Sequence, residues 1–109
     1  MKPGSLPFSL HDPEVLRVHA DAACALLKAL SNTDRLMLLC CMGGERRNVG
    51  ELEAATGIRQ PSLSQQLAVL RQEGLVTTEK EGKYVYYRLS DPRALRLMQT
   101  LAGIFCAAP

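Results

Sequence analysis

The 109-residue sequence predicts a mainly α-helical (α+β) domain of the winged helix-turn-helix class, with about five helices and a β-hairpin wing. Two patterns lead to this prediction. A short helical segment, a glycine and a longer helix with a leucine face follow one another over residues 50–74. Directly after them come two runs rich in β-branched and aromatic residues, joined around Glu81 and Gly82, which are typical of a hairpin.

The first part of the chain is predicted to contain a flexible arm and two helices. Residues 1–13 are rich in proline, glycine and serine, which is typical of a mobile terminus. Apolar residues at helical spacing predict a helix over residues 14–30. Ser31 or Asn32 can cap a second helix that runs to about Met42, where two glycines end it.

The helix-turn-helix motif occupies the middle of the chain. Residues 48–49 are predicted to form a short strand, and residues 50–56 a short helix that Gly57 stops. Pro61 suits the first turn of the longer helix, which Gly74 terminates.

The wing and one more helix complete the domain. The two wing strands are predicted over residues 75–79 and 83–89. Asp91 and Pro92 then open a last helix that runs to about Ala107. A chain of this length forms one domain with a modest core, and dimerisation would enlarge that core.

The composition excludes several classes of protein. Hydrophobic residues make up 47% of the chain and charged residues 22%, which is typical of a soluble globular domain. No apolar run approaches the roughly 18 residues of a membrane helix, and no signal-peptide segment is present, so we expect a cytoplasmic protein without a membrane partner. Residues 1–58 carry six basic and seven acidic side chains, whereas residues 59–109 carry seven basic and four acidic ones. An anionic partner is therefore expected to meet the second half.

The longer helix of the motif carries side chains that suit DNA recognition. Serine and glutamine can donate and accept hydrogen bonds at base edges in the major groove, and arginine and lysine can contact phosphates. The candidate DNA-binding residues are Arg59, Gln60, Ser62, Ser64, Gln65, Lys80 and Lys83. The polar face of an isolated helix is more often simply solvated, but the turn, hairpin and leucine pattern together favour double-stranded DNA as the partner. Arg46 and Arg47, in contrast, are interpreted as a solvated turn.

Three segments resemble the ArsR/SmtB family of winged-helix repressors, over about residues 22–107: LKALSNTDRLMLL, VGELEAATGIRQPSLSQQLAVLRQEGLV and GKYVYYRL. The resemblance implies a homodimer whose first and last helices form the interface, so that residues 14–109 would be a DNA-binding domain with dimerisation helices at both ends. It also implies an operator with twofold symmetry, read by one recognition helix per half-site. A sensor site would release that operator when it binds or reacts. Gln66 departs from the family, in which many members have histidine.

Two metal-sensor patterns of the family are missing most of their ligands here. The segment VGELEAATG contains no cysteine or histidine, and the segment DPRALRLMQTLAGIFC contains Asp91 but no histidine. One metal-sensing alternative stays open, in which a three-thiolate site binds As(III) or Cd(II). Its ligands would be Cys40, Cys41 and either Cys24 or Cys106.

Cys40, which ends the run RLMLLC, and Cys106, in IFCA, resemble the thiol pair of another branch of the family, that of the biofilm growth-associated and sulfide-responsive repressors. The resemblance implies that reactive sulfur species or oxidants join these two thiols, by a disulfide or a polysulfide, and release DNA. The spacing of the two residues does not by itself bring them into contact. Cys24 and Cys41 are interpreted as small buried hydrophobic residues.

Two other functions stay open. Cys40 could be the nucleophile of a thiol enzyme or a persulfide carrier, but no thioredoxin-like Cys-x-x-Cys or suitable histidine supports this. We therefore expect a protein that is not an enzyme and that holds no cofactor or bound metal. The remaining alternative is a DNA-binding dimer without a sensor.

Overall fold

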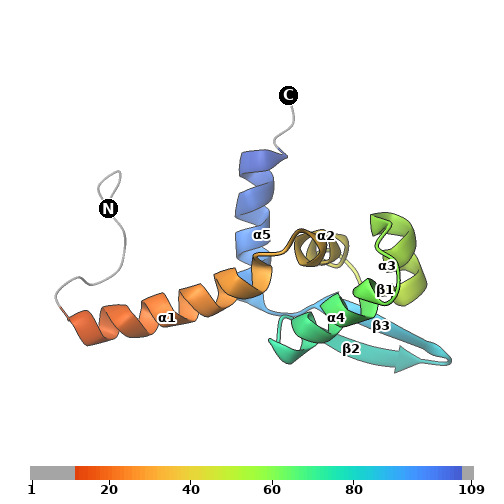
Figure 1. Ribbon diagram of the computed structural model, residues 1–109, viewed down its shortest axis with the longest axis horizontal. Coiled ribbons are helices and arrows are strands. Elements are labelled where there is room, and N and C mark those ends of the chain that lie inside the picture. The colour runs from red at the N-terminus through yellow and green to blue at the C-terminus, as the bar shows by residue number, and fades with distance from the viewer. Residues whose placement is uncertain (1–11, 107–109) are drawn as a thin grey trace.

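The computed structural model describes residues 12–106 as five helices and three short strands (Figure 1). The helices are α1 (Pro13–Leu30), α2 (Thr33–Cys41), α3 (Val49–Thr56), α4 (Ser62–Gln72) and α5 (Pro92–Phe105). The strands are β1 (Arg47–Asn48), β2 (Val76–Glu81) and β3 (Tyr84–Leu89), which form one antiparallel sheet of order β1-β3-β2. The prediction of a winged helix-turn-helix fold is confirmed, with α3 and α4 as the motif and β2–β3 as the wing.

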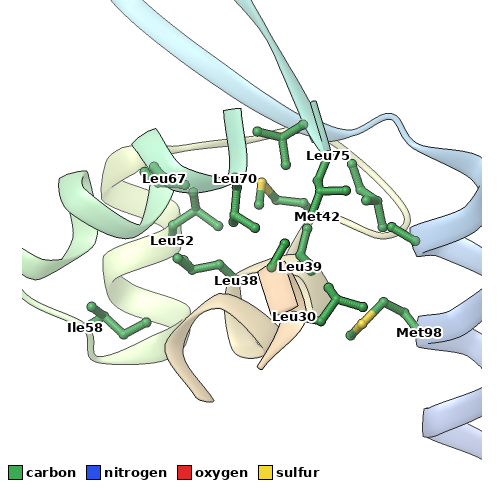
Figure 2. Close-up of a cluster of buried hydrophobic side chains, with 14 of the residues drawn as sticks. Leu30, Leu38, Leu39, Met42, Leu52, Ile58, Leu67, Leu70, Leu75 and Met98 are labelled. Atoms are coloured by element: carbon green, nitrogen blue, oxygen red, sulfur yellow. The ribbon is translucent and has the colours of Figure 1, made fainter. Parts of the chain in front are cut away.

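The core lies where α2, α3 and α4 meet the start of β2 (Figure 2). Its largest fully buried side chains are Leu38, Leu39, Met42, Leu52, Leu63, Leu67, Leu70 and Leu75. Leu63, Leu67 and Leu70 are the predicted apolar face of α4, and all three are buried. Because this face anchors α4 to the core, the opposite face of the helix is left for other contacts.

The terminal helices α1 and α5 extend away from this core (Figure 1). Each of them buries only two side chains in the single chain, Ala29 and Leu30 on α1 and Ala94 and Met98 on α5. Other apolar side chains on the two helices stay exposed, namely Val15, Val18, Leu27, Ile104 and Phe105. No helix within residues 12–106 combines the length and the hydropathy needed to cross a membrane. The exposed apolar side chains instead offer surface that a partner chain could cover.

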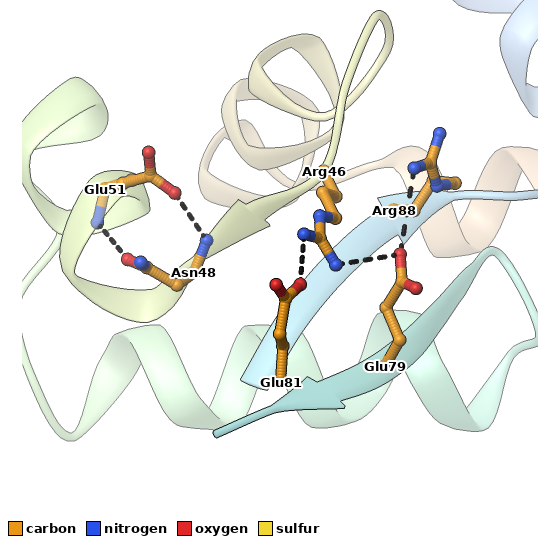
Figure 3. Close-up of polar contacts among 6 residues, drawn as sticks. All are labelled: Arg46, Asn48, Glu51, Glu79, Glu81 and Arg88. Atoms are coloured by element: carbon orange, nitrogen blue, oxygen red, sulfur yellow. Dashed lines mark hydrogen bonds and ion pairs between the residues drawn. The ribbon is translucent and has the colours of Figure 1, made fainter. Parts of the chain in front are cut away.

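Side-chain caps fix where four of the helices begin. The capping residues are Asp12 before α1, Asn32 before α2, Asn48 before α3 and Asp91 before α5. At α3 the cap is reciprocal. The Asn48 side chain accepts from the backbone N–H of Glu51, and the Glu51 side chain accepts from that of Asn48, both at 2.9 Å (Figure 3). These bonds satisfy N–H groups that have no acceptor inside the helix.

The wing turn lies one residue later than predicted. Glu81 pairs with Tyr84, so Gly82 and Lys83 form the two-residue turn. Gly82 has a φ of +61°, which suits a hairpin turn with glycine in its first central position. β2 therefore continues through Glu81, and Lys83 stands at the tip of the wing rather than in the second strand.

A short junction connects the wing to α5. The backbone N–H groups of Ser90 and Asp91 both donate to the carbonyl oxygen of Leu75, at 3.0 and 3.3 Å. The N–H of Leu89 donates to the carbonyl oxygen of Met42 at 3.4 Å. The end of β3 and the beginning of α5 are thus both hydrogen-bonded to the domain core.

Other predicted boundaries differ slightly from the observed ones. Asp12 caps α1 and Pro13 begins it, so these two residues are not part of an arm. The strand predicted over residues 48–49 is β1 at Arg47–Asn48, because Asn48 already caps α3. The rest of the predicted arm, residues 1–11, and the predicted helix end at Ala107 lie outside the described residues.

Candidate DNA interface and thiol site

The recognition helix α4 presents polar side chains opposite its buried leucines. Ser64 and Gln65 are exposed on its first turns, and Ser62, at its first position, is half-buried. Arg59 and Gln60 are exposed in the turn that leads into it. This turn begins at Gly57, whose φ of +73° ends α3 in the left-handed conformation that glycine adopts without strain. The predicted groove-facing residues are therefore gathered at one end of the motif.

Gln60 and Ser64 contact each other in the free protein. The side-chain oxygen of Gln60 accepts from the backbone N–H of Ser64 at 3.0 Å and from its hydroxyl at 2.7 Å. Pro61 occupies the N-cap position of α4 and makes no side-chain cap bond, so Gln60 supplies the acceptor for the first turn. The amide nitrogen of Gln60 carries two further donors, which suit an acceptor on a base edge or a phosphate.

The two predicted wing lysines lie at the end of the hairpin. Lys80 is exposed on β2, and Lys83 is exposed in the turn with its ammonium 5.5 Å from the centre of the Tyr84 ring. Because side chains alternate along a strand, Lys80 projects to the opposite face of the hairpin from Glu79 and Glu81. The wing therefore has a basic tip and, on one face, two carboxylates.

Arg46 is not the solvated side chain that the sequence suggested. Its guanidinium pairs with Glu79 at 3.5 Å and with Glu81 (Figure 3). The same group lies 4.2 Å from the centre of the Tyr86 ring. The hydrogen bond to Glu81 is the main cause that raises the pKa of Arg46 above its ordinary value. Arg47 pairs with Glu45 at 3.0 Å and donates to the carbonyl oxygen of Cys41 at 3.2 Å. Both arginines stay partly exposed to solvent, but they are ion-paired, which the solvated-turn interpretation did not include.

Gln66 is half-buried, in contrast to the exposed Ser64 and Gln65 of the same helix. Its side-chain oxygen accepts a hydrogen bond from Arg35 at 3.0 Å. The same guanidinium donates to the carbonyl oxygens of Ala29 at 2.5 Å and Lys28 at 3.3 Å, at the end of α1. Arg35, in the first turn of α2, therefore hydrogen-bonds to both α1 and the recognition helix.

Cys40 and Cys106 line the same cavity between α2 and α5. The cavity has a volume of about 280 Å³, and its other walls are Leu36, Met98, Leu101, Ala102 and Phe105. Cys40 lies in the last turn of α2, and Cys106 is the residue that caps the end of α5. Both are free thiols in this structure. Residues 66 positions apart in the sequence thus face one apolar space.

The surroundings of Cys40 disfavour its thiolate. Partial burial is the largest cause that raises the pKa of Cys40, and the neighbouring thiols of Cys41 and Cys106 raise it further, because a second negative charge nearby would repel the first. Burial and the neighbouring thiols thus all favour the neutral, protonated form of Cys40.

The other two cysteines have different environments. Cys41 is half-buried and packs against the core, which agrees with its interpretation as a small hydrophobic residue. Cys24 is exposed on α1, so the same interpretation is wrong for Cys24 in the single chain. Within residues 12–106, no group of three or more His, Cys, Asp or Glu side chains is placed to hold a metal ion.

Two residues that shape the site were missed from the sequence, Arg35 and Arg46. For Arg46 the sequence did contain a signal. Glu79 and Glu81 are two residues apart, so they lie on the same face of a strand, and two carboxylates on one face favour a basic partner. For Arg35 the sequence contains no such signal, because its contact with Gln66 joins positions 31 residues apart.

Comparison with known protein sequences gives the following similarities. The family model described as "Bacterial regulatory protein, arsR family" matches residues 32–78. The biofilm growth-associated repressor of Agrobacterium fabrum is 52% identical over 82 residues, which cover 75% of this chain and 70% of that protein. The biofilm growth-associated repressor of Xylella fastidiosa is 46% identical, with 86% and 82% covered. The transcriptional activator HlyU of Vibrio cholerae is 41% identical, with 94% and 92% covered.

Solved structures are similar over most of the chain. The transcriptional repressor BigR from Xylella fastidiosa matches with a TM-score of 0.81 at 44% identity, covering 89% of this chain and 99% of that chain. Reduced HlyU from Vibrio cholerae matches with a TM-score of 0.80 at 37% identity, covering 84% and 96%. A homodimeric winged helix-turn-helix DNA-binding domain from Mycobacterium bovis matches with a TM-score of 0.71 at 27% identity, covering 88% and 89%.

Proposed function

This chain belongs to the arsR family of bacterial regulatory proteins, and from that premise we propose that it is a homodimeric repressor that releases its operator when Cys40 and Cys106 become linked. Membership of the family makes the chain a DNA-binding transcriptional regulator and not an enzyme. Beyond family membership, we propose that the chain forms a homodimer, which residues contact DNA, and which signal causes the protein to release DNA. A reversible thiol pair fits a reducing compartment such as the cytoplasm.

One observation carries the thiol switch: Cys40 and Cys106 line a single apolar cavity between α2 and α5. Cys40 belongs to the helix that packs on α3 and α4, and Cys106 to a helix that extends from the core. A bond between them would therefore fix the position of α5 relative to the helix-turn-helix motif. That coupling is what a switch between two DNA affinities requires.

The DNA-binding surface of each protomer comprises the start of α4 and the tip of the wing. Ser64 and Gln65 would meet base edges in the major groove, and Arg59 would meet the backbone. Lys80 and Lys83 would meet phosphates beside the groove. Gln60 and Ser62 would complete the contacts at the helix start. Two such surfaces in a dimer would read an operator with twofold symmetry.

The proposed chemistry has two steps, the transfer of a sulfur atom to one thiol and then the attack of the second thiolate on the persulfide so formed. A thiolate of the pair attacks the outer sulfur of a persulfide RSSH, forming a protein persulfide and releasing the thiol RSH. The second thiolate then attacks the inner sulfur, the Cys40–Cys106 disulfide forms, and hydrogen sulfide leaves. If both thiols have become persulfides, the same exchange gives a trisulfide and hydrogen sulfide. With a peroxide, the first thiol becomes a sulfenic acid, and the disulfide then forms with loss of water.

The energy that such a switch needs is small. A hundredfold loss of operator affinity corresponds to about 2.7 kcal/mol of difference between the two states. A disulfide holds its two Cβ atoms about 3.5–4.5 Å apart with a restricted dihedral angle, so it imposes one spacing on α2 and α5. If α2 and α5 are spaced slightly differently in the DNA-bound protein, the disulfide strains that state, and this strain would supply the required free-energy difference.

The test treats the reduced protein with an organic persulfide, and separately with a disulfide or a peroxide. Peptide mass spectrometry maps the linkage, and operator binding is followed in the same samples. We expect a Cys40–Cys106 link, with or without added sulfur, together with loss of DNA binding. Cys40→Ser and Cys106→Ser should each bind DNA and keep binding it after treatment with the inducer. The matched control Cys24→Ser should lose DNA binding on treatment, as the wild type does. Unlinked thiols in a protein that binds DNA equally well before and after treatment would refute the switch.

A further inference from the structure

The wing carries negative charge close to where the proposed function brings it to DNA. Glu81 directly precedes the turn at Gly82 and Lys83, and its side chain is 63% exposed. Glu79 lies two residues earlier on the same face and is 52% exposed. Salt screens exposed charges only beyond about 10 Å, so an unpaired carboxylate next to the tip would act on the phosphates that the tip contacts. Such carboxylates would oppose the attraction that Lys83 provides.

Arg46 reaches these carboxylates from the other edge of the sheet. It directly precedes β1, the edge strand, and both glutamates lie on β2, the opposite edge. Its guanidinium lies over the ring of Tyr86, which belongs to the middle strand. It pairs with both carboxylates (Figure 3). The aromatic ring adds a cation–π contact that holds the guanidinium over the sheet.

The two carboxylates do not depend on Arg46 equally. Glu79 also pairs with Arg88 at 3.7 Å, whereas among the described residues Glu81 pairs with Arg46 alone. Loss of Arg46 would therefore leave Glu81, the residue nearer the tip, without a cationic partner. Glu79 would keep one.

We propose that Arg46 is a positioning residue for DNA binding: it neutralises the acidic face of the wing and thereby sets how strongly the wing holds the operator. This inference rests on the DNA-binding part of the proposed function and does not involve the thiol pair. It assigns Arg46 no contact with DNA. Its effect on affinity passes through Glu81, so removing the charge of Glu81 should make Arg46 dispensable.

The experiment compares the reduced wild-type protein with Arg46→Gln, Arg46→Gln/Glu81→Gln and the control Arg93→Gln. Arg93 also pairs with a carboxylate, that of Asp91, but it lies at the start of α5, at the other end of β3 from the wing turn. The probe is a fluorescent duplex obtained by in vitro selection against the wild-type protein. Anisotropy titrations over a series of salt concentrations give both the affinity and its salt dependence. Circular dichroism checks that each variant is folded.

We expect Arg46→Gln to weaken binding about three- to tenfold, the range for exposing one like charge near the phosphates of each half-site. The loss should become smaller as the salt concentration rises, because salt screens the repulsion between the unpaired Glu81 carboxylate and the phosphates. The double variant should regain wild-type affinity to within about twofold, and Arg93→Gln should bind like the wild type.

Three results would overturn the inference. A salt slope that is shallower by about 0.9 for each phosphate no longer neutralised, and that the double variant does not restore, would make Arg46 a phosphate ligand. A double variant as weak as Arg46→Gln would make Arg46 a purely structural clamp, since the rescue depends on charge. Unchanged affinity in Arg46→Gln would mean that the carboxylates have no influence. A wild-type protein that selects no duplex would contradict the proposed function itself, which is a separate outcome.

Discussion

Arg35 should contribute more to stability than other half-buried polar residues of this domain, because its guanidinium joins three helices. It lies on α2 and donates to two carbonyl oxygens at the end of α1 and to Gln66 on α4. Substitution of Arg35 by methionine keeps most of the side-chain volume and removes all three hydrogen bonds. We expect this change to loosen the attachment of α1 to the motif.

The magnitude follows from the contacts. A hydrogen bond to a charged group contributes about 1.5–3 kcal/mol, and a cation at the end of a helix adds about 0.3–1 kcal/mol. Because Arg35 is only half-buried, water can replace part of what the α1 carbonyl groups lose. We therefore expect Arg35→Met to lower the free energy of unfolding by about 2–3 kcal/mol. Gln66→Met removes one of the three bonds, and water can replace Gln66 at the half-buried guanidinium, so this change should cost about 1 kcal/mol or less.

The assay is urea denaturation followed by far-UV circular dichroism. All variants must be measured at one protomer concentration, because association shifts the apparent stability. The double variant closes a mutant cycle, and the coupling between Arg35 and Gln66 should be about 0.5–1.5 kcal/mol. Arg35→Lys should not restore stability, because one ammonium cannot reach both α1 and α4.

Two results would refute this reasoning. If Gln66→Met costs as much as Arg35→Met, the contact with α4 would account for the whole effect and the α1 carbonyl groups for none of it. If Arg35→Met costs less than about 0.5 kcal/mol, the guanidinium would behave as an ordinary surface group.

Three further predictions concern other parts of the molecule. Leu38→Ala should lower the free energy of unfolding by about 3–5 kcal/mol, since Leu38 is fully buried, and a loss below about 1 kcal/mol in denaturant titrations would contradict the described core. Arg93 lowers the pKa of Asp91 through a side-chain hydrogen bond, so the stabilisation is present above the unfolded-state pKa of the carboxyl and is lost as pH falls through the lower, folded-state pKa. Asp91→Asn should therefore flatten the acid side of the stability–pH curve, and an unchanged slope there would count against the pair. The raised pKa of Cys40 should place the midpoint of its alkylation rate above that of free cysteine in pH-dependent labelling, and a midpoint at or below that value would contradict the apolar cavity.

The fold was largely predictable because its signals are local. Either Ser31 or Asn32 was expected to cap α2, and Asn32 does so. The leucine spacing of α4 identified its buried face. The wing turn was predicted one residue too early, because glycine suits either central position of a two-residue turn. Only the pairing of Glu81 with Tyr84 distinguishes the two registers.

The candidate site was less predictable because its important contacts join distant parts of the chain. Family resemblance, and not spacing, indicated that Cys40 and Cys106 belong together, and the shared cavity supports that choice. The hydrogen bond between Gln66 and Arg35 was not predicted, because it joins positions 31 residues apart. Cys24 was expected to be buried because cysteine is usually buried, yet α1 extends beyond the core.

The junction at Ser90 and Asp91 gives the domain the geometry of a lever with two nearly equal arms. On one side, the 14 residues of α5 span about 21 Å towards Cys106. On the other, the six residues of β3 span about 20 Å towards the wing tip. If the two arms moved as one rigid body about the hydrogen bonds to Leu75, a shift of about 2 Å at the thiol end would be a rotation of about 6° and would move the tip by a similar distance. Because β3 is the middle strand, such a rotation would carry β1 and β2 with it and would move the lysine at the tip of the wing about as far as Cys106.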